Sequence, residues 1–214
     1  MRVGNVFGCS HAYGHGLSDC YDPDTGWPAL SPSKQAWPSL LRELGLYDVS
    51  YNHSKVGASS DDVLKQILSV ESYIFDKRYG EGDIYIALWP TYTRRSVLNK
   101  DKQLETYRIQ DESTECKEFY KITHTNELKY NYYKNILTAN LYLQDVEFYN
   151  FFVDLEDMDD HFEFCPTLAD FQHRFSRIDF QYILNKHDKA LDNVHLGIDG
   201  HVELAKRINT FINS

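Results

Sequence analysis

The sequence predicts an α/β fold in which helices cover both faces of a central parallel sheet. Segments typical of strands alternate with segments typical of helices along the 214 residues, the connections between them are short, and no clear hairpin signal appears. The most distinct strand, residues 83–89, is a nearly unbroken apolar run between Gly82 and Pro90, as expected for a strand covered on both faces. We therefore expect three layers, α/β/α, with this strand near the centre.

The first half of the chain predicts two strand-loop-helix units. An apolar strand over residues 2–7 is followed by a stretch rich in glycine and polar residues, which predicts a loop. A helix is predicted over 33–45, because apolar residues recur there at helical spacing and Gly45 suits a C-cap. The second unit has a strand over 48–52, a polar loop, and a helix that begins at Ser60.

The second half predicts one more strand and two more helices. Helices are expected over 131–144 and 201–212, and a strand rich in aromatic residues over 146–153. Residues 99–129 are polar, charged and weakly periodic, and we expect them to form an inserted or irregular segment. The length suits one sizeable core, so we expect a single domain over 1–214.

The composition excludes several classes of protein and of partner. Hydrophobic residues make up 42% of the chain and aromatic residues 14%, which argues against a disordered protein. The net charge of -10 and the pI near 5.3 argue against a nucleic acid or an anionic membrane as the main partner, since both favour a basic surface. A neutral small-molecule substrate is expected instead. The oligomeric state is not indicated.

The termini, cysteines and histidines carry further expectations. No basic segment followed by an apolar one is found at the start, and no run of about 18 apolar residues occurs, so we expect a cytoplasmic protein without a membrane span. Four scattered cysteines suit free thiols in a reducing compartment. His11 and His15 are the nearest approach to a pair of metal ligands, and we expect neither a metal nor a cofactor.

Two distant segments together predict a catalytic site. Asp192 and His195 are three residues apart, close enough for the carboxylate to hold the imidazole in one tautomer and to stabilise it when it is protonated. Ser10 follows the first predicted strand, where a turn can present its hydroxyl at the carboxyl edge of the sheet. Gly57 and Thr91 also follow predicted strands. In a parallel sheet, catalytic residues usually lie at such positions, just after the carboxyl ends of the strands.

Each of these residues also has a purely structural interpretation. Ser10 alone would more often be a turn residue or a helix N-cap, and Gly57 a turn glycine. Asn52 could simply order its loop. Thr91 and Arg94 could be structural residues after the strand. A separate alternative is that Cys9 is the nucleophile and His11 its base, but no third group is visible to orient that histidine.

Taken together, these segments resemble the four sequence blocks of the SGNH (GDSL-type) hydrolases. Phe7-Gly8-Cys9-Ser10 is similar to the first block with its nucleophilic serine, and residues 52–57 to the second, whose glycine N–H helps to form an oxyanion hole. The segment 192–195 matches the final Asp-x-x-His block, and 200–205 resembles the helix start that follows it. The resemblance extends over nearly the whole chain and implies a flavodoxin-like three-layer fold.

Two departures from the family pattern stand out. The first block normally reads Gly-Asp-Ser, and here Cys9 replaces the aspartate. The third block normally reads Gly-x-Asn-Asp, whereas here the central strand runs into Trp-Pro-Thr-Tyr-Thr-Arg, so the asparagine is missing. Counted from the end of the strand, Thr91 takes its place, and Arg94 is another candidate donor. These departures resemble a divergent branch associated with bacteriophages and marine microbes, which would place the protein in a host cytoplasm or a virion.

The resemblance implies a serine esterase or deacetylase acting on a small acyl ester or an O-acetylated carbohydrate through an acyl-enzyme. Ser10 would be the nucleophile, His195 the base and Asp192 the group that orients it. The oxyanion hole would consist of the N–H groups of Ser10 and Gly57 with the side chain of Thr91. The altered third block favours a second hypothesis, a catalytically weak binding or virion-assembly module with the same fold.

Overall fold

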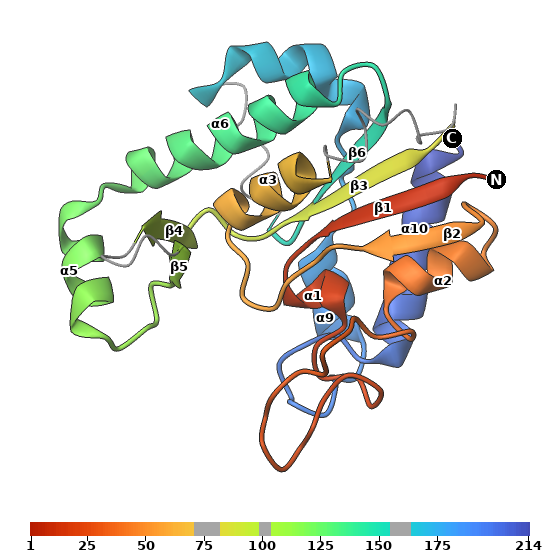
Figure 1. Cartoon of the computed structure of the whole chain (residues 1–214), viewed down its shortest axis with the longest axis horizontal. Coiled ribbons are helices and arrows are strands. Elements are labelled where there is room, and N and C mark those ends of the chain that lie inside the picture. The colour runs from red at the N-terminus through yellow and green to blue at the C-terminus, as the bar shows by residue number, and fades with distance from the viewer. Residues whose placement is uncertain (71–81, 99–103, 155–163) are drawn as a thin grey trace.

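The computed structural model describes residues 1–70, 82–98, 104–154 and 164–214. Its centre is a four-stranded sheet in the order β2-β1-β3-β6, in which every neighbouring pair is parallel (Figure 1). The strands are β1 (Val3–Gly8), β2 (Val49–Asn52), β3 (Ile84–Trp89) and β6 (Glu147–Phe152). The predicted α/β fold with a central parallel sheet is confirmed, and β3 is one of its two inner strands.

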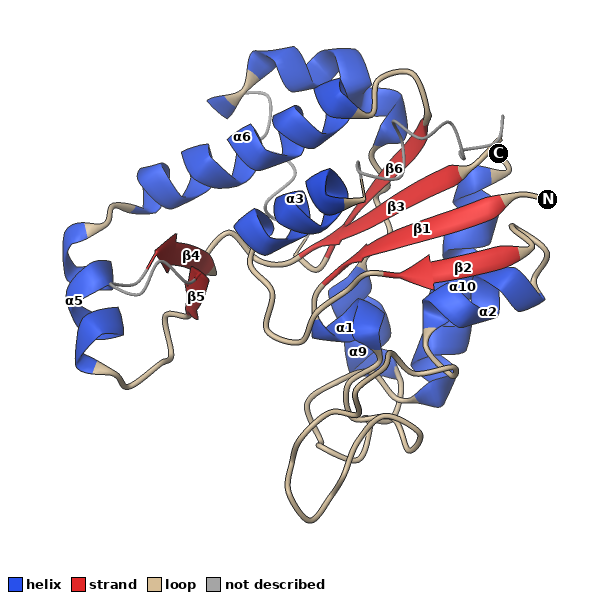
Figure 2. Cartoon of the chain, viewed as in Figure 1, coloured by secondary structure: helices blue, strands red, loops and turns tan. Residues whose placement is uncertain are grey.

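Helices cover both faces of this sheet (Figure 2). One apolar core joins the sheet to α2, α9 and α10, and a second core joins the opposite face to α3 and α6. The helices are α1 (Ser10–Tyr13), α2 (Trp37–Glu43), α3 (Ser60–Ser69), α5 (Thr114–Ile122), α6 (Thr125–Tyr142), the 3-10 helix η1 (Pro166–Arg174), α9 (Phe180–Lys186) and α10 (Ile198–Ile212). None of the helices in these described ranges has the length and apolar character needed to cross a membrane.

The two cores follow from the alternation of side chains along a strand. In β3, Ile84 and Ile86 point into the core under α2 and α10, whereas Tyr85 and Ala87 point into the core under α3 and α6. All six residues of β3 are buried. An unbroken apolar run is therefore what this strand needs, because neither of its faces meets water.

Residues 104–129, the described part of the predicted segment 99–129, are more regular than the sequence predicts. A short antiparallel pair, β4 (Arg95–Leu98) with β5 (Leu104–Tyr107), precedes α5, and α6 begins at Thr125, six residues before the predicted start at 131. The expectation of an inserted or irregular segment is corrected here for the described residues, which form β5, α5 and the start of α6. Another correction concerns the loop predicted after the first strand, which begins as the one-turn helix α1.

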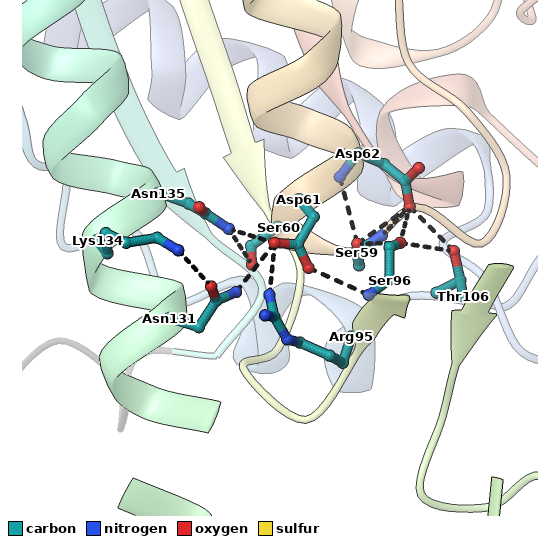
Figure 3. A network of polar contacts seen from close by, with 10 residues as sticks. All are labelled: Ser59, Ser60, Asp61, Asp62, Arg95, Ser96, Thr106, Asn131, Lys134 and Asn135. Carbon is teal, nitrogen blue, oxygen red and sulfur yellow. Dashed lines mark hydrogen bonds and ion pairs between the residues drawn. The ribbon is translucent and has the colours of Figure 1, made fainter. Parts of the chain in front are cut away.

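Two adjacent aspartates at the start of α3 hold β4, β5 and α6 in place (Figure 3). Asp62 closes a capping box with Ser59, and its Oδ2 also accepts hydrogen bonds from the hydroxyls of Ser96 at 2.8 Å and Thr106 at 2.9 Å. Asp61 accepts from Arg95 at 2.6 Å and from Asn131 at 3.0 Å. These bonds anchor the β4–β5 pair beside α3, close to the carboxyl edge of the sheet.

A buried histidine joins α10 to α2. Nδ1 of His201 accepts a hydrogen bond from the amide of Trp37 at 3.2 Å, and the ring is only 1% exposed. Burial, followed by the charge of His195, lowers the pKa of His201 from 6.5 to about 3. Because the folded state then binds fewer protons than the unfolded chain below about pH 6.5, this residue makes stability fall as the pH decreases.

We expect the free energy of unfolding to fall between pH 6.5 and pH 5, with about 1.5 kcal/mol of the loss due to His201. His201→Gln keeps an acceptor for the Trp37 amide and removes the titrating ring, so its stability should depend less steeply on pH. Urea unfolding at several pH values measures the slopes, with His173→Gln as the control at an exposed histidine. Equal slopes for the wild type and His201→Gln would contradict this account.

Candidate active site

Ser10 lies where β1 ends and α1 begins. The backbone just before it is fixed on both sides, because the side chain of Gln66 bonds both the amide of Gly8, at 2.9 Å, and its carbonyl, at 3.1 Å. Cys9 is the N-cap of α1, and Ser10 is the first residue of that helix. An amide at this position has no acceptor within the helix. The side chain of Ser10 is nearly buried, at 3% exposed.

The segment that carries His195 packs against the chain just after α1. The amide of Leu191 donates to the carbonyl of Gly16 at 2.9 Å. Gly16 has a φ of +89°, and a β-carbon there would lie 2.8 Å from Oδ1 of Asp192. Only glycine therefore lets the two ends of the chain approach this closely.

Ser10, His195 and Asp192 form a continuous chain of hydrogen bonds. Oγ of Ser10 lies 2.8 Å from Nε2 of His195, and Nδ1 of the same ring lies 2.5 Å from Oδ2 of Asp192. A carboxylate can only accept, so Nδ1 carries the proton and Nε2 accepts from the Ser10 hydroxyl. The sequence-predicted residues of the final block and of the first block thus meet in space.

Asp192 is held as an anion. Burial acts to raise its pKa, but hydrogen bonds from the amides of His195 and Val194, each at 3.0 Å, and from the His195 ring outweigh that effect, so that the pKa is lowered. A turn with Asn193 in the left-handed region, at a φ of +57°, brings these amides to the carboxylate. A permanently charged Asp192 can stabilise His195 whenever that ring takes up a proton.

Two further histidines flank His195. The ring of His11 lies 4.7 Å from that of His195 and the ring of His15 lies 4.9 Å away, centroid to centroid. Burial first, then the charge of His195, lowers the pKa of both flanking rings, that of His11 well below its usual value. Both rings are therefore neutral at neutral pH, and they shield His195 from solvent without adding positive charge next to it.

His15, Asp192 and His195 also form the only group of potential metal ligands found among the described residues. Their donor atoms lie within 4.8 Å of one another, and Nε2 of His15 is 3.8 Å from Asp192. A metal bound here would have to replace the proton shared by Asp192 and His195. The same atoms therefore cannot serve a metal and Ser10 together.

Asn52 is the last residue of β2, and Gly57 belongs to the loop that follows it. Gly57 has a φ of +78°, which favours glycine, and its amide donates no hydrogen bond within the described part of the chain. Asn52 uses both ends of its side chain structurally: Nδ2 donates to the carbonyl of Ala12 at 2.7 Å, and Oδ1 accepts from the amide of Ser54 at 3.1 Å. Asn52 thus ties this loop to α1.

The two candidates after β3 differ in their surroundings. The hydroxyl of Thr91 lies 2.9 Å from the hydroxyl of Thr93, so one of its hydrogen-bonding positions is occupied. Arg94 is half-buried, its Nη1 has no hydrogen-bond partner, and its charge contributes to the lowered pKa of His11. Arg94 is therefore electrostatically coupled to His11, whose ring packs against that of His195.

Cys9 and Arg108 complete the surroundings of the site. Cys9 is 1% exposed and packs in the core under α2 and α10, which argues against the Cys9–His11 alternative. Arg108 was missed by the sequence analysis: a β-carbon on Gly57 would lie 2.4 Å from its Nη2. No sequence signal indicates this contact, because it depends on how the β4–β5 pair packs.

Comparisons with known proteins support the fold. No protein-family model and no curated protein matches the sequence. A carbohydrate esterase with divergent catalytic and non-catalytic binding functions in its active site matches 99% of this chain, with a TM-score of 0.57 and 15% identity. This chain spans only 64% of the length of that protein.

Two other solved structures match over nearly their whole length. A catalytic mutant of an acetylxylan esterase from Geobacillus stearothermophilus has a TM-score of 0.55 and 12% identity, and the match covers 100% of this chain and 94% of that one. A G-D-S-L family lipolytic protein from Desulfitobacterium hafniense has a TM-score of 0.51 and 10% identity, with 99% of each chain covered. The chain therefore has the α/β fold of SGNH (GDSL-type) hydrolase structures.

Proposed function

We propose that this protein is a serine esterase or deacetylase that hydrolyses a small acyl ester or an O-acetylated carbohydrate. The observation that carries the proposal is the hydrogen-bonded chain from Ser10 through His195 to Asp192. An ordinary serine hydroxyl is a weak nucleophile, and a neutral imidazole on its oxygen, oriented by a carboxylate, is the arrangement that activates it.

In the proposed reaction, Nε2 of His195 takes the proton of Ser10 while the hydroxyl oxygen attacks the ester carbonyl. The protonated ring is stabilised by Asp192 and then gives its proton to the departing alcohol, which leaves an acyl-Ser10. Water enters, loses a proton to His195 and attacks the acyl group. The carboxylic acid leaves, and the proton returns to Ser10.

The negative charge that develops on the carbonyl oxygen needs hydrogen-bond donors. The free amides of Ser10 and Gly57 are the proposed backbone donors, and the hydroxyl of Thr91 is the proposed third donor in place of the family's asparagine. Thr91 can still donate if Thr93 is the donor in the contact between their hydroxyls.

The structural relatives support this assignment of roles. Solved structures of the Geobacillus acetylxylan esterase are catalytic mutants in which a histidine, an aspartate or a serine is replaced by alanine. The same three residue types meet here. The second hypothesis, a catalytically weak binding module, is favoured by the missing asparagine and by the engagement of Thr91 with Thr93.

Hydrolysis of p-nitrophenyl acetate separates the two hypotheses. We expect the wild type to turn the ester over, and both Ser10→Ala and His195→Ala to abolish turnover, because the two residues act as a unit. Release of p-nitrophenol measures the rate. His173→Gln, at an exposed histidine, is the matched control and should retain the full rate.

Two outcomes would count against this assignment. A folded Ser10→Ala variant that hydrolyses the ester like the wild type would remove Ser10 as the nucleophile. A wild type no faster than His195→Ala would favour the binding module. Circular dichroism establishes that each variant is folded.

Thr91 tests the replacement of the missing asparagine. Thr91→Val keeps the shape of the side chain and removes the donor, so turnover should fall about 10-fold or more, with a smaller change in KM, since the donor acts in the transition state. Thr91→Ser should be tolerated. Steady-state kinetics with p-nitrophenyl acetate measures both parameters.

The same series also tests the placement of the third donor. If Thr91→Val retains the wild-type rate while Arg94→Ala loses it with this neutral ester, the third donor is the guanidinium of Arg94. Thr91 would then be a structural residue.

A further inference from the structure

Two arginines without a carboxylate partner lie next to the proposed active site. Arg94 precedes β4 and Arg108 follows β5, so both come from the segment that replaces and follows the family's third block. Both side chains are half-buried. Within the described ranges, no hydrogen bond or ion pair involves either guanidinium.

The pairing of β4 with β5 sets the backbones of Arg94 and Arg108 at facing positions just beyond the end of the ladder. The register pairs Ser96 with Thr106 and Arg95 with Tyr107, so one further step places Arg94 opposite Arg108. The hydroxyl of Tyr120 secures this end of the pair, because it donates to the carbonyl of Tyr107 at 3.1 Å and also contacts the carbonyl of Thr93. Like charges at facing positions repel each other, so an anion bound by both guanidiniums would stabilise this end of the pair.

Arg95, the residue next to Arg94, has a partner for its charge. Arg95 forms an ion pair with Asp61 at 2.6 Å. Arg94, one residue earlier, has a buried Nη1 that finds no acceptor among the residues the structure describes. Burying a charged donor without a partner is costly, and such groups in proteins are normally paired. Two partly buried guanidiniums that lack acceptors among the described residues therefore indicate a ligand that supplies those acceptors.

Each guanidinium interacts with a group of the proposed site, Arg108 through a contact and Arg94 through its charge. Nη2 of Arg108 lies against Gly57, the proposed oxyanion glycine, at the point where a β-carbon would otherwise be. Arg94 acts electrostatically on His11, whose ring packs against that of His195. A ligand held by the two arginines would thus be next to the ester attacked by Ser10.

We propose that Arg94 and Arg108 bind a carboxylate of the substrate, so that the preferred ester is an O-acylated acidic sugar or a similar ester with a carboxylate close to the acylated hydroxyl. This inference rests on the proposed function. Planar guanidinium groups match a carboxylate with paired N–H donors, which gives both affinity and orientation. The expectation of a neutral substrate rests on the overall charge of -10. The two arginines make the local charge at this place positive, so a substrate with a negative charge suits it better.

The test compares two matched substrates, O-acetylated galacturonic acid and O-acetylated galactose, by release of acetate. We expect the wild type to show a kcat/KM at least 10-fold higher for the acidic sugar, with most of the difference in KM. Arg94→Gln and Arg108→Gln should each remove most of this preference, because hydrogen bonds to charged groups are stronger than neutral ones. The readout is the ratio of the two kcat/KM values, which reports the contact with the carboxylate separately from the chemical step that both sugars share.

Lys121→Gln is the matched control, since Lys121 lies in α5 and forms an exposed ion pair with Glu118. It removes one positive charge from the same part of the chain and should leave the preference intact. Thermal unfolding of each variant establishes that it is folded.

The outcomes distinguish this inference from the proposed function. If the wild type hydrolyses p-nitrophenyl acetate but treats the two sugars alike, only the carboxylate inference is overturned. If both arginine variants lose activity equally on the acidic and the neutral sugar, the arginines serve the oxyanion and the inference is again wrong. If no ester is hydrolysed at all, both proposals fail.

Discussion

The contact between Ser10 and His195 joins two residues 185 positions apart, and the rest of the site depends on it. It requires β1 to end beside β3, so that Ser10 emerges at the carboxyl edge of the sheet, and it requires the segment before α10 to lie against Gly16. The buried bond between His201 and Trp37 keeps α10 on α2, and thereby holds this segment in place. Packing remote from Ser10 thus sets a distance of 2.8 Å at the site.

The charge states of the groups around this contact depend more on burial than on the net charge of the whole chain. The chain is acidic overall, yet the described groups around His195 are one carboxylate with a lowered pKa and two neutral imidazoles. Arg94 and Lys189 contribute positive charge near His11, and Arg108 lies against Gly57. A low-polarity interior makes such local charges count for more than the distant surface carboxylates, which solvent screens.

The sequence predicts those features that depend on local pattern. The apolar run of β3 and the Asp192–His195 spacing could both be recognised in the sequence. A strand buried on two faces and a carboxylate three residues from an imidazole each produce a pattern among neighbouring residues. No such local pattern in the sequence predicted the β4–β5 pair. It is held by Asp61 and Asp62 from α3, and contacts between distant segments have no periodicity to detect.

The same distinction applies to the site residues. Gly57 was predicted as a functional glycine, but nothing local indicates that Arg108, fifty-one positions later, lies over it. Asn52 was a candidate for the site, and only the structure reveals that both ends of its amide are bonded to backbone groups. Residues that act through long-range packing are therefore the ones that sequence reasoning misses.

The central claim is that Ser10 is an activated nucleophile, and covalent labelling tests it most directly. An alkyl fluorophosphonate reacts with a serine beside a competent base and leaves ordinary serines untouched. After incubation of the folded protein, peptide mass spectrometry should place a single adduct on Ser10, and the adduct should be absent from the His195→Ala variant. Labelling of Cys9, or no labelling of the folded wild type, would contradict the account.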